Sequence, residues 1–193
     1  MKISSVLARL SLASLAQAAT LNVGSGKTYS TITAAYNAAS SGDTIMVYPG
    51  TYSEKLTISK SSITIKGSTY PSLNPSANTA LMTYSTYASA SGSDDSSATL
   101  LVSGSGFKMY NMNITNTAGT GGQAVALSAT GTSQSFYACA LKGYQDTLYS
   151  HTGTQYFSRC YIEGAIDFIF GRTGQSWYQG VRILGLQRWS EKG

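Results

Sequence analysis

Apolar residues first recur with helical spacing in the segment 29–41. Four of them stand at i, i+3, i+4 and i+7, which places them on one face of a helix. Gly42 follows, a residue that commonly ends helices. The pattern therefore predicts one short amphipathic helix. Its apolar face consists of Ile32, Ala35, Tyr36 and Ala39.

From Asp43 onward the pattern becomes that of β-strands. Short runs rich in β-branched residues alternate with Gly, Ser and Asn, as in brief strands joined by tight turns. Residues 69–98 are rich in Ser, Ala and Thr with little periodicity, which predicts a long loop. The clearest strand runs are TIMVYPG at 44–50, LTISKSSITIKG at 56–67, TLLVSGSGFKMYNMNITN at 99–116 and AVALSATG at 124–131.

The second half of the chain repeats itself. The segment FYACALKG at 136–143 matches FSRCYIEG at 157–164, with Phe, Cys, a large aliphatic residue and Gly in register at an offset of 21. The offset continues without a slip and pairs Asp146 with Asp167. It then pairs Leu148 with Ile169 and Tyr149 with Phe170.

A repeat of this length, built from short strands and without room for a helix in each copy, indicates a solenoid of stacked coils. The closely spaced leucines and the asparagine of a leucine-rich horseshoe are absent. The sequence therefore predicts an all-β fold, a parallel β-helix, in which the helix at 29–41 covers the open first coil.

Stacking brings Asp146 and Asp167 about 4.8 Å apart at the backbone. Two carboxylates held so close do not ionise equally, so one pKa rises and the other stays low. The pair is thus a candidate for acid–base chemistry. Two alternatives stay open: the residues cap turns, or they bind calcium together with Glu163.

The first residues have the character of a secretory signal. Lys2 precedes an apolar run at 10–16, and Ala16 and Ala18 flank Gln17 as at a cleavage site. We expect residues 1–18 to be a signal peptide and residues 19–193 one domain, secreted to the extracellular space. No other segment has the length of apolar sequence that a membrane span requires, so no membrane association is expected.

The charge of the chain is mildly basic. Removal of Lys2 and Arg9 with the signal lowers the formal charge of +5 to +3. This bias favours an acidic polymer, whereas no run of Lys and Arg suggests nucleic acid.

Four motifs together resemble the pectin methylesterase (pectinesterase) family, in that family's order, over residues 20–178. The resemblance implies a right-handed parallel β-helix and pectin as the substrate, with no metal or organic cofactor. We expect a monomer, although no pattern in the sequence determines the oligomeric state. The motifs are TIMVYPGTYSEKLTISKSSITIKG at 44–67, GGQAVAL at 121–127, GYQDTLYSHTGTQYF at 143–157 and YIEGAIDFIFG at 161–171.

The same resemblance assigns roles to the motif residues. It implies Asp167 as the nucleophile that attacks the galacturonate methyl ester, and Asp146 as the acid that protonates methanol and then the base toward water. Gln123 and Gln145 would donate to the oxyanion. Tyr149 and Phe170 match positions that line the sugar-binding cleft; the alternative is that these rings only pack between coils.

The resemblance ends near Gln179. Family members carry an Arg followed by a Trp on a later coil, and this motif is missing, so we expect the C-terminal coils to be incomplete. Continuing the offset of 21 places Arg188 at the level of Asp167, which gives the hypothesis that Arg188 replaces the missing Arg. Two rival functions follow: an inactive truncated β-helix that at most binds polysaccharide, or a pectate lyase-like enzyme.

Cys139 and Cys160 also lie 21 residues apart. Stacked coils would bring their backbones within the range of a disulfide, and secretion allows oxidation, but a reduced pair in the core is an equal alternative. His151 is the only histidine, and without a Ser or Cys nucleophile beside it we interpret it as a loop residue.

Overall fold

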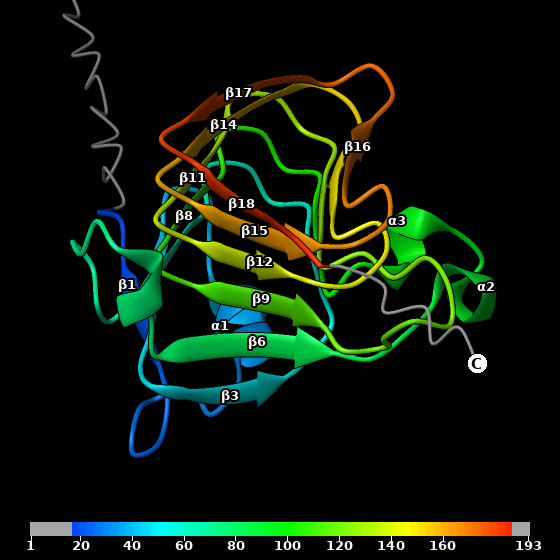
Figure 1. Ribbon diagram of the computed structural model, residues 1–193. Helices are drawn as coiled ribbons and strands as arrows, with labels where there is room; N and C mark the ends of the chain where they lie inside the picture. The colour runs from blue at the N-terminus through cyan, green and yellow to red at the C-terminus, as the bar shows by residue number, and fades with distance from the viewer. Residues whose placement is uncertain (1–16, 187–193) are drawn as a thin grey trace, which may run out of the picture.

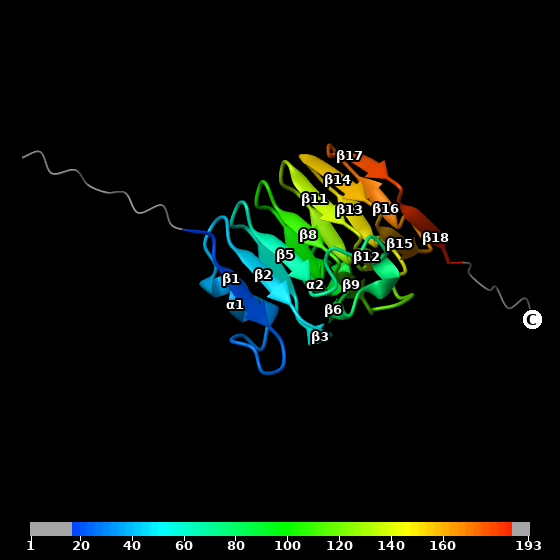
Figure 2. The same cartoon turned by 90° about the vertical axis from the view of Figure 1, so that its left-hand side faces the viewer.

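The computed structural model describes residues 17–186 as three parallel β-sheets around a common core (Figure 1). From β2 onward the chain visits the sheets in a fixed cycle, so each coil adds one strand to each sheet. The coils stack in chain order from β1 to β18 (Figure 2). The predicted all-β parallel β-helix is confirmed.

The strands of the described residues divide among sheets A, B and C. Sheet A contains β1 (Thr20–Val23), β2 (Thr44–Val47), β5 (Thr64–Gly67), β8 (Lys108–Tyr110), β11 (Gln134–Tyr137), β14 (Thr154–Ser158) and β17 (Gln175–Gln179). Sheet B contains β3 (Gly50–Ser53), β6 (Ala80–Tyr84), β9 (Asn113–Asn116), β12 (Ala140–Lys142), β15 (Tyr161–Gly164) and β18 (Arg182–Gly185). Sheet C contains β4 (Leu56–Ile58), β7 (Leu100–Val102), β10 (Leu127–Ala129), β13 (Leu148–Ser150) and β16 (Ile169–Gly171).

The predicted offset of 21 residues is the register of the sheets from β10 onward, whereas the earlier coils pair at other offsets. Phe136 pairs with Phe157 in sheet A. The same spacing holds in the other two sheets and continues into β17 and β18, as the following pairs show: Leu141 with Ile162, Leu148 with Ile169, Phe157 with Tyr178, and Ile162 with Ile183.

Equivalent side chains stack along the helix axis inside the coils. The fully buried rings of Phe136 and Phe157, which are paired in register, have centroids 4.8 Å apart. Phe107 also contacts Phe136, with centroids 5.9 Å apart, although the register pairs Phe136 with Met109. Burying one such ring stabilises the fold by roughly 1.5–3 kcal/mol. The repeat of Phe in the sequence is therefore the repeat of the core.

The predicted helix is α1 (Ile32–Ala38), which contacts β1 and β2 at the N-terminal end of the stack. Its buried face is the predicted one. The Thr31 hydroxyl accepts from Ala34 N at 3.1 Å, and the Glu54 carboxylate accepts from Ile32 N and Thr33 N at 2.9 and 2.8 Å. These acceptors satisfy the free N–H groups of the first turn.

The prediction of one long loop over residues 69–98 is wrong in part. This segment contains strand β6, the 3-10 helix η1 (Pro75–Ala77), and the short helices α2 (Ala88–Ser91) and α3 (Asp94–Ser97). β6 pairs with β3 and β9, so sheet pairing fixes a strand that its own composition conceals. Among the helices between residues 17 and 186, none is long and apolar enough to span a membrane.

Candidate active site

Asp146 and Asp167 occupy the same place in successive coils, between sheet B and sheet C. Asp146 N donates to Ile166 O at 3.0 Å, and the next paired residues are Leu148 and Ile169. Both aspartates have left-handed backbone, with φ of 65° and 43°. This conformation costs a non-glycine residue roughly 1–2 kcal/mol. Such strain is concentrated at functional sites.

The two carboxyl groups differ in environment. Asp146 is only 2% exposed, whereas Asp167 is exposed to solvent. The pKa of Asp146 is raised to about 6, mainly by burial; a hydrogen bond from the Gln123 side chain opposes the rise, and the negative charges of Asp94 and Asp167 add to it. The geometry thus provides a buried group that can hold a proton beside a carboxylate that a substrate can reach.

Gln123 and Gln145 lie at the same edge of the stack as Asp146. Ala124 N donates to Gln145 O at 3.1 Å, which joins the chain after Gln123 to the residue before Asp146. The backbone of Gln123 accepts from Ala88 N at 2.8 Å, so the start of α2 also contacts this edge. The structure therefore brings both predicted amide residues next to the buried carboxyl group.

The predicted aromatic residues stack on one another. The rings of Tyr149 and Phe170 have centroids 4.2 Å apart and planes 7° apart. Tyr149 also stacks on His151 at 4.3 Å, and it packs with Ala98 and Val125 in a small apolar cluster separate from the main core. These rings pack between coils. Each also follows an aspartate by three residues in the chain, Tyr149 after Asp146 and Phe170 after Asp167.

Residues of α3 belong to the site, although no pattern in the sequence predicts their place there. The Asp95 carboxylate lies 2.9 Å from His151 Nδ1 and accepts from Ser128 Oγ at 2.6 Å. α2 and α3 accordingly lie beside sheet C (Figure 1). Asp94 precedes Asp95 and acts on Asp146 through its charge. The scarcity of acidic residues was the signal that could have drawn attention to the Asp94–Asp95 pair.

Arg172 is a second residue that the sequence did not single out. Its positive charge and a hydrogen bond act to lower the pKa of Tyr149, but burial outweighs both and raises that pKa. A cation therefore lies near Tyr149. The hypothesis for Arg188 concerns a position outside the described residues 17–186.

Both cysteines are buried free thiols in the structure. Cys139 Sγ donates to Tyr137 O at 3.3 Å, and Cys160 Sγ donates to Phe136 O at 3.4 Å. Burial raises the pKa of Cys139 well above its usual value. Over the described part of the chain, no three His, Cys, Asp or Glu side chains converge in the manner of a metal site.

Comparison with known proteins gives consistent matches. The family model named Pectinesterase matches residues 18–192. A probable pectinesterase A of Aspergillus fumigatus is 44% identical over 147 residues, which are 74% of this chain and 45% of the relative. The crystal structure of the Aspergillus niger pectin methylesterase aligns with a TM-score of 0.82 at 43% identity, over 85% of this chain and 56% of that one.

A third match is a pectin methylesterase solved in complex with a hexasaccharide, with a TM-score of 0.77 at 28% identity. It covers 90% of this chain and 57% of that one. The chain thus spans about half the length of the relatives it matches. With the family model matched over residues 18–192 and the paired aspartates in register, the chain belongs to the pectinesterase family.

Proposed function

We propose that the protein hydrolyses methyl esters of galacturonate units in pectin and releases methanol. The observation that carries this proposal is the pairing of a buried Asp146, whose pKa is raised to about 6, with an exposed Asp167 one coil away. Membership of the pectinesterase family supports the same reaction. The two carboxyl groups suit an ester hydrolysis in which one attacks and the other transfers protons.

In the first half of the reaction, an Asp167 carboxylate oxygen attacks the ester carbonyl carbon. The C–O bond to the methoxy group then breaks, and methanol leaves with the proton of Asp146. In the second half, Asp146 as carboxylate takes a proton from water, whose oxygen attacks the acyl group on Asp167. Breaking the anhydride bond between the acyl group and the Asp167 carboxyl releases the free galacturonate and restores both groups.

The tetrahedral intermediates of both halves carry an oxyanion. Amide N–H groups that already point to this position stabilise the negative charge as it forms. Gln123 and Gln145 have this role in the proposal, since both lie at the edge that holds Asp146. Tyr149 and Phe170 offer a stacked apolar surface for the sugar rings, in keeping with the hexasaccharide held by the structurally similar methylesterase.

We also propose that the protein is secreted and acts outside the cell, in the modification or breakdown of plant cell walls. The support is the signal-like pattern of residues 1–18 and the start of β1 at Thr20, close behind the expected cleavage site. N-terminal sequencing of protein recovered from the culture medium tests this. A first residue near Ala18 or Ala19 is the expected result, and retention of Met1 would contradict it.

The test of activity is methanol release from highly methylated pectin, without added calcium. We expect release by the parent chain, and at least about a thousandfold less from Asp167→Asn, which keeps the shape of the side chain but removes the nucleophile. Asp146→Asn should retain the fold and lose most of the rate. No release from a folded parent would favour the inactive β-helix, and calcium-dependent chain cleavage would favour a lyase.

A further inference from the structure

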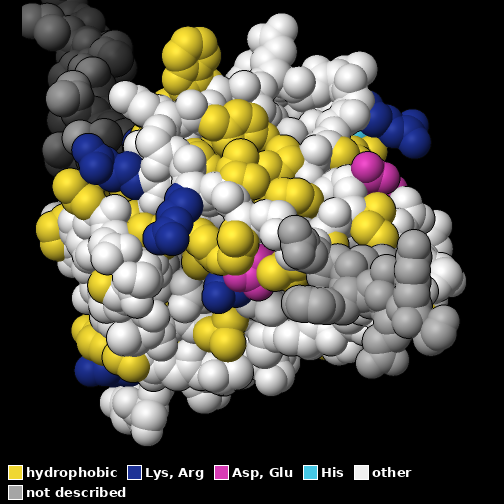
Figure 3. Space-filling view, viewed as in Figure 1, with side chains coloured by type: hydrophobic (Ala, Val, Ile, Leu, Met, Phe, Trp, Pro, Cys, Tyr) yellow, Lys and Arg dark blue, Asp and Glu magenta, His cyan; other side chains and the backbone are white. Residues whose placement is uncertain are grey.

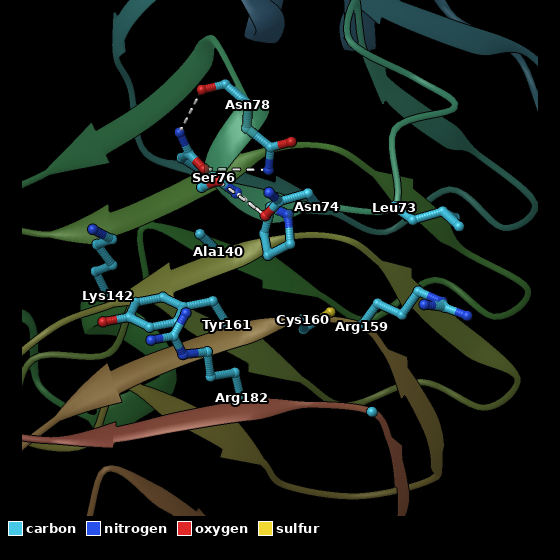
Figure 4. Close-up of a pocket in the computed structure, with 13 residues that line it drawn as sticks. Leu73, Asn74, Ser76, Asn78, Ala140, Lys142, Arg159, Cys160, Tyr161 and Arg182 are labelled. Carbon is cyan, nitrogen blue, oxygen red and sulfur yellow. Dashed lines mark hydrogen bonds between the residues drawn. The ribbon is translucent and has the colours of Figure 1, made fainter.

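A groove of about 610 Å³ lies on the outer face of sheet B, and none of the proposed catalytic residues lines it. Its floor is formed by β12, β15 and β18, and one wall by the segment around η1. Figure 4 shows the side chains of Lys142, Tyr161 and Arg182 close together, with Arg159 toward the other end. Sheet B faces the viewer in Figure 1, and the same view in Figure 3 shows several Lys and Arg side chains on this face.

The stacking of coils fixes the spacing of the groove's charges. Tyr161 pairs with Arg182 on the next strand, and Lys142 lies on the preceding strand. Neighbouring strands are about 4.8 Å apart, so Lys142 and Arg182 come from the strands on either side of Tyr161, with Lys142 in register with Glu163. Lys142 Nζ lies 5.4 Å from the centre of that ring.

The wall of the groove is held in place by asparagine side chains. Asn111 Nδ2 donates to Ser72 O at 2.9 Å and to Asn78 Oδ1 at 3.1 Å. Asn78 Nδ2 donates to Ala138 O at 2.9 Å. These bonds tie the loop before β6 to turns of two later coils, so the groove is formed before any ligand arrives and ligand binding need not order it.

The charges of the groove favour an anionic ligand. Three cations line it, and one nearby carboxylate opposes them: Glu163 lies 3.9 Å from Lys142 Nζ and accepts from the Tyr161 hydroxyl at 2.6 Å. Positive charge therefore remains in excess. Carboxylates pair with Arg and Lys, and the partly exposed Tyr161 ring can contact a sugar ring.

We propose that this groove on sheet B binds a run of demethylated galacturonate units, separately from the catalytic cleft. The inference rests on the proposed function, because a carboxylate-bearing polymer is the product of that reaction and its methyl ester is the substrate. Binding of the product at a second site would hold the protein on a polymer that it has begun to demethylate. The effective concentration of the remaining esters at the catalytic cleft would then be raised.

The test uses the full chain carrying Asp167→Asn, so that no ester is turned over during the measurement. Amide NMR shifts are followed during titration with fully demethylated hexagalacturonate at low salt. We expect shifts on β12, β15 and β18, and roughly tenfold weaker binding at these strands after Lys142→Gln with Arg182→Gln, because two charge-assisted contacts are lost. Lys108→Gln, which removes an exposed lysine of sheet A, is the matched control and should bind like the parent.

Three outcomes would overturn the proposal. They are shifts confined to the neighbourhood of Tyr149 and Phe170, equal shifts with inorganic phosphate alone, and unchanged binding by the double variant. Methanol release by the chain with Asp167 intact is measured separately. Groove binding without methanol release would contradict the proposed function and leave the groove assignment standing. Methanol release without groove binding would contradict the groove assignment and leave the proposed function standing.

Discussion

The Asp95 carboxylate lies 2.9 Å from His151 Nδ1, although 56 residues separate them. Asp95 also accepts from Ser128 Oγ at 2.6 Å, so one side chain ties α3 to strand β10 and to the residue that follows β13. His151 in turn stacks on Tyr149. The position of α3, and with it the charge of Asp94 near Asp146, therefore depends on a contact made by Asp95.

Asp95→Ala removes both bonds and should loosen α3. We expect the free energy of unfolding to fall by about 1–3 kcal/mol, because Ser128 and His151 lose a partly buried acceptor. The kcat/KM for methanol release should fall by about tenfold, since the aromatic stack loses its support. Asp95→Asn keeps an oxygen for Ser128 and is the matched control, with a smaller loss on both measures. Equal loss in the two variants would contradict this account.

The rate of methanol release should depend on the protonation of Asp146. Its pKa is raised to about 6 by burial and by the charges of Asp94 and Asp167. As the acid that protonates methanol, Asp146 must carry its proton, so kcat/KM should fall as pH rises through about 6. Asp94→Asn removes one negative charge and should move this fall to lower pH. An unmoved profile for Asp94→Asn would show that Asp94 does not act on Asp146.

The same raised pKa predicts the pH dependence of stability. The folded protein binds the Asp146 proton up to about pH 6, whereas the ordinary value is 3.8. The stability that this proton contributes is fully present below the ordinary pKa, and it is lost as pH rises through the folded-state pKa. Asn resembles the protonated form, so Asp146→Asn should match the parent near pH 3 and exceed it at pH 8 by up to about 3 kcal/mol.

Urea unfolding at pH 3 and pH 8 measures these stabilities. Asp43 provides the control, because its pKa is shifted in the opposite direction. Backbone N–H groups of Ser40 and Ala19 donate to its carboxylate and hold its pKa below the ordinary value. Asp43→Asn should therefore lose stability at pH 8. A loss of stability for Asp146→Asn as well would mean that the buried carboxylate is stabilised in the fold, contrary to the burial argument.

The sequence predicted those features that repeat. The offset of 21 residues predicted the coil, its register and the pairing of Asp146 with Asp167, because equivalent positions of successive coils stack in a solenoid. It did not reveal β6 or α3, since each depends on partners far along the chain. The link between Asp95 and His151 joins a segment without periodicity to the end of β13, and no local pattern encodes such a contact.

Gly153 marks a corner between sheets C and A where the coils approach closely. Its φ of +77° is in the left-handed region, and a Cβ there would collide with Gly131 O of the preceding coil. Gly119 has a similar φ of +84° but has open space where a Cβ would lie. An alanine at either position would have to adopt the left-handed backbone conformation, which costs about 1–2 kcal/mol. Only Gly153→Ala would also place a Cβ where no space is available.

We therefore expect Gly153→Ala to lower the free energy of unfolding by about 1–3 kcal/mol more than Gly119→Ala does. Urea unfolding of both variants at one pH measures the difference. The corner precedes β14 and follows His151, so a shift of the coil there should also reduce methanol release in Gly153→Ala and leave it unchanged in Gly119→Ala. Equal stability of the two variants would show that the backbone conformation, and not the close approach of the coils, requires glycine at position 153.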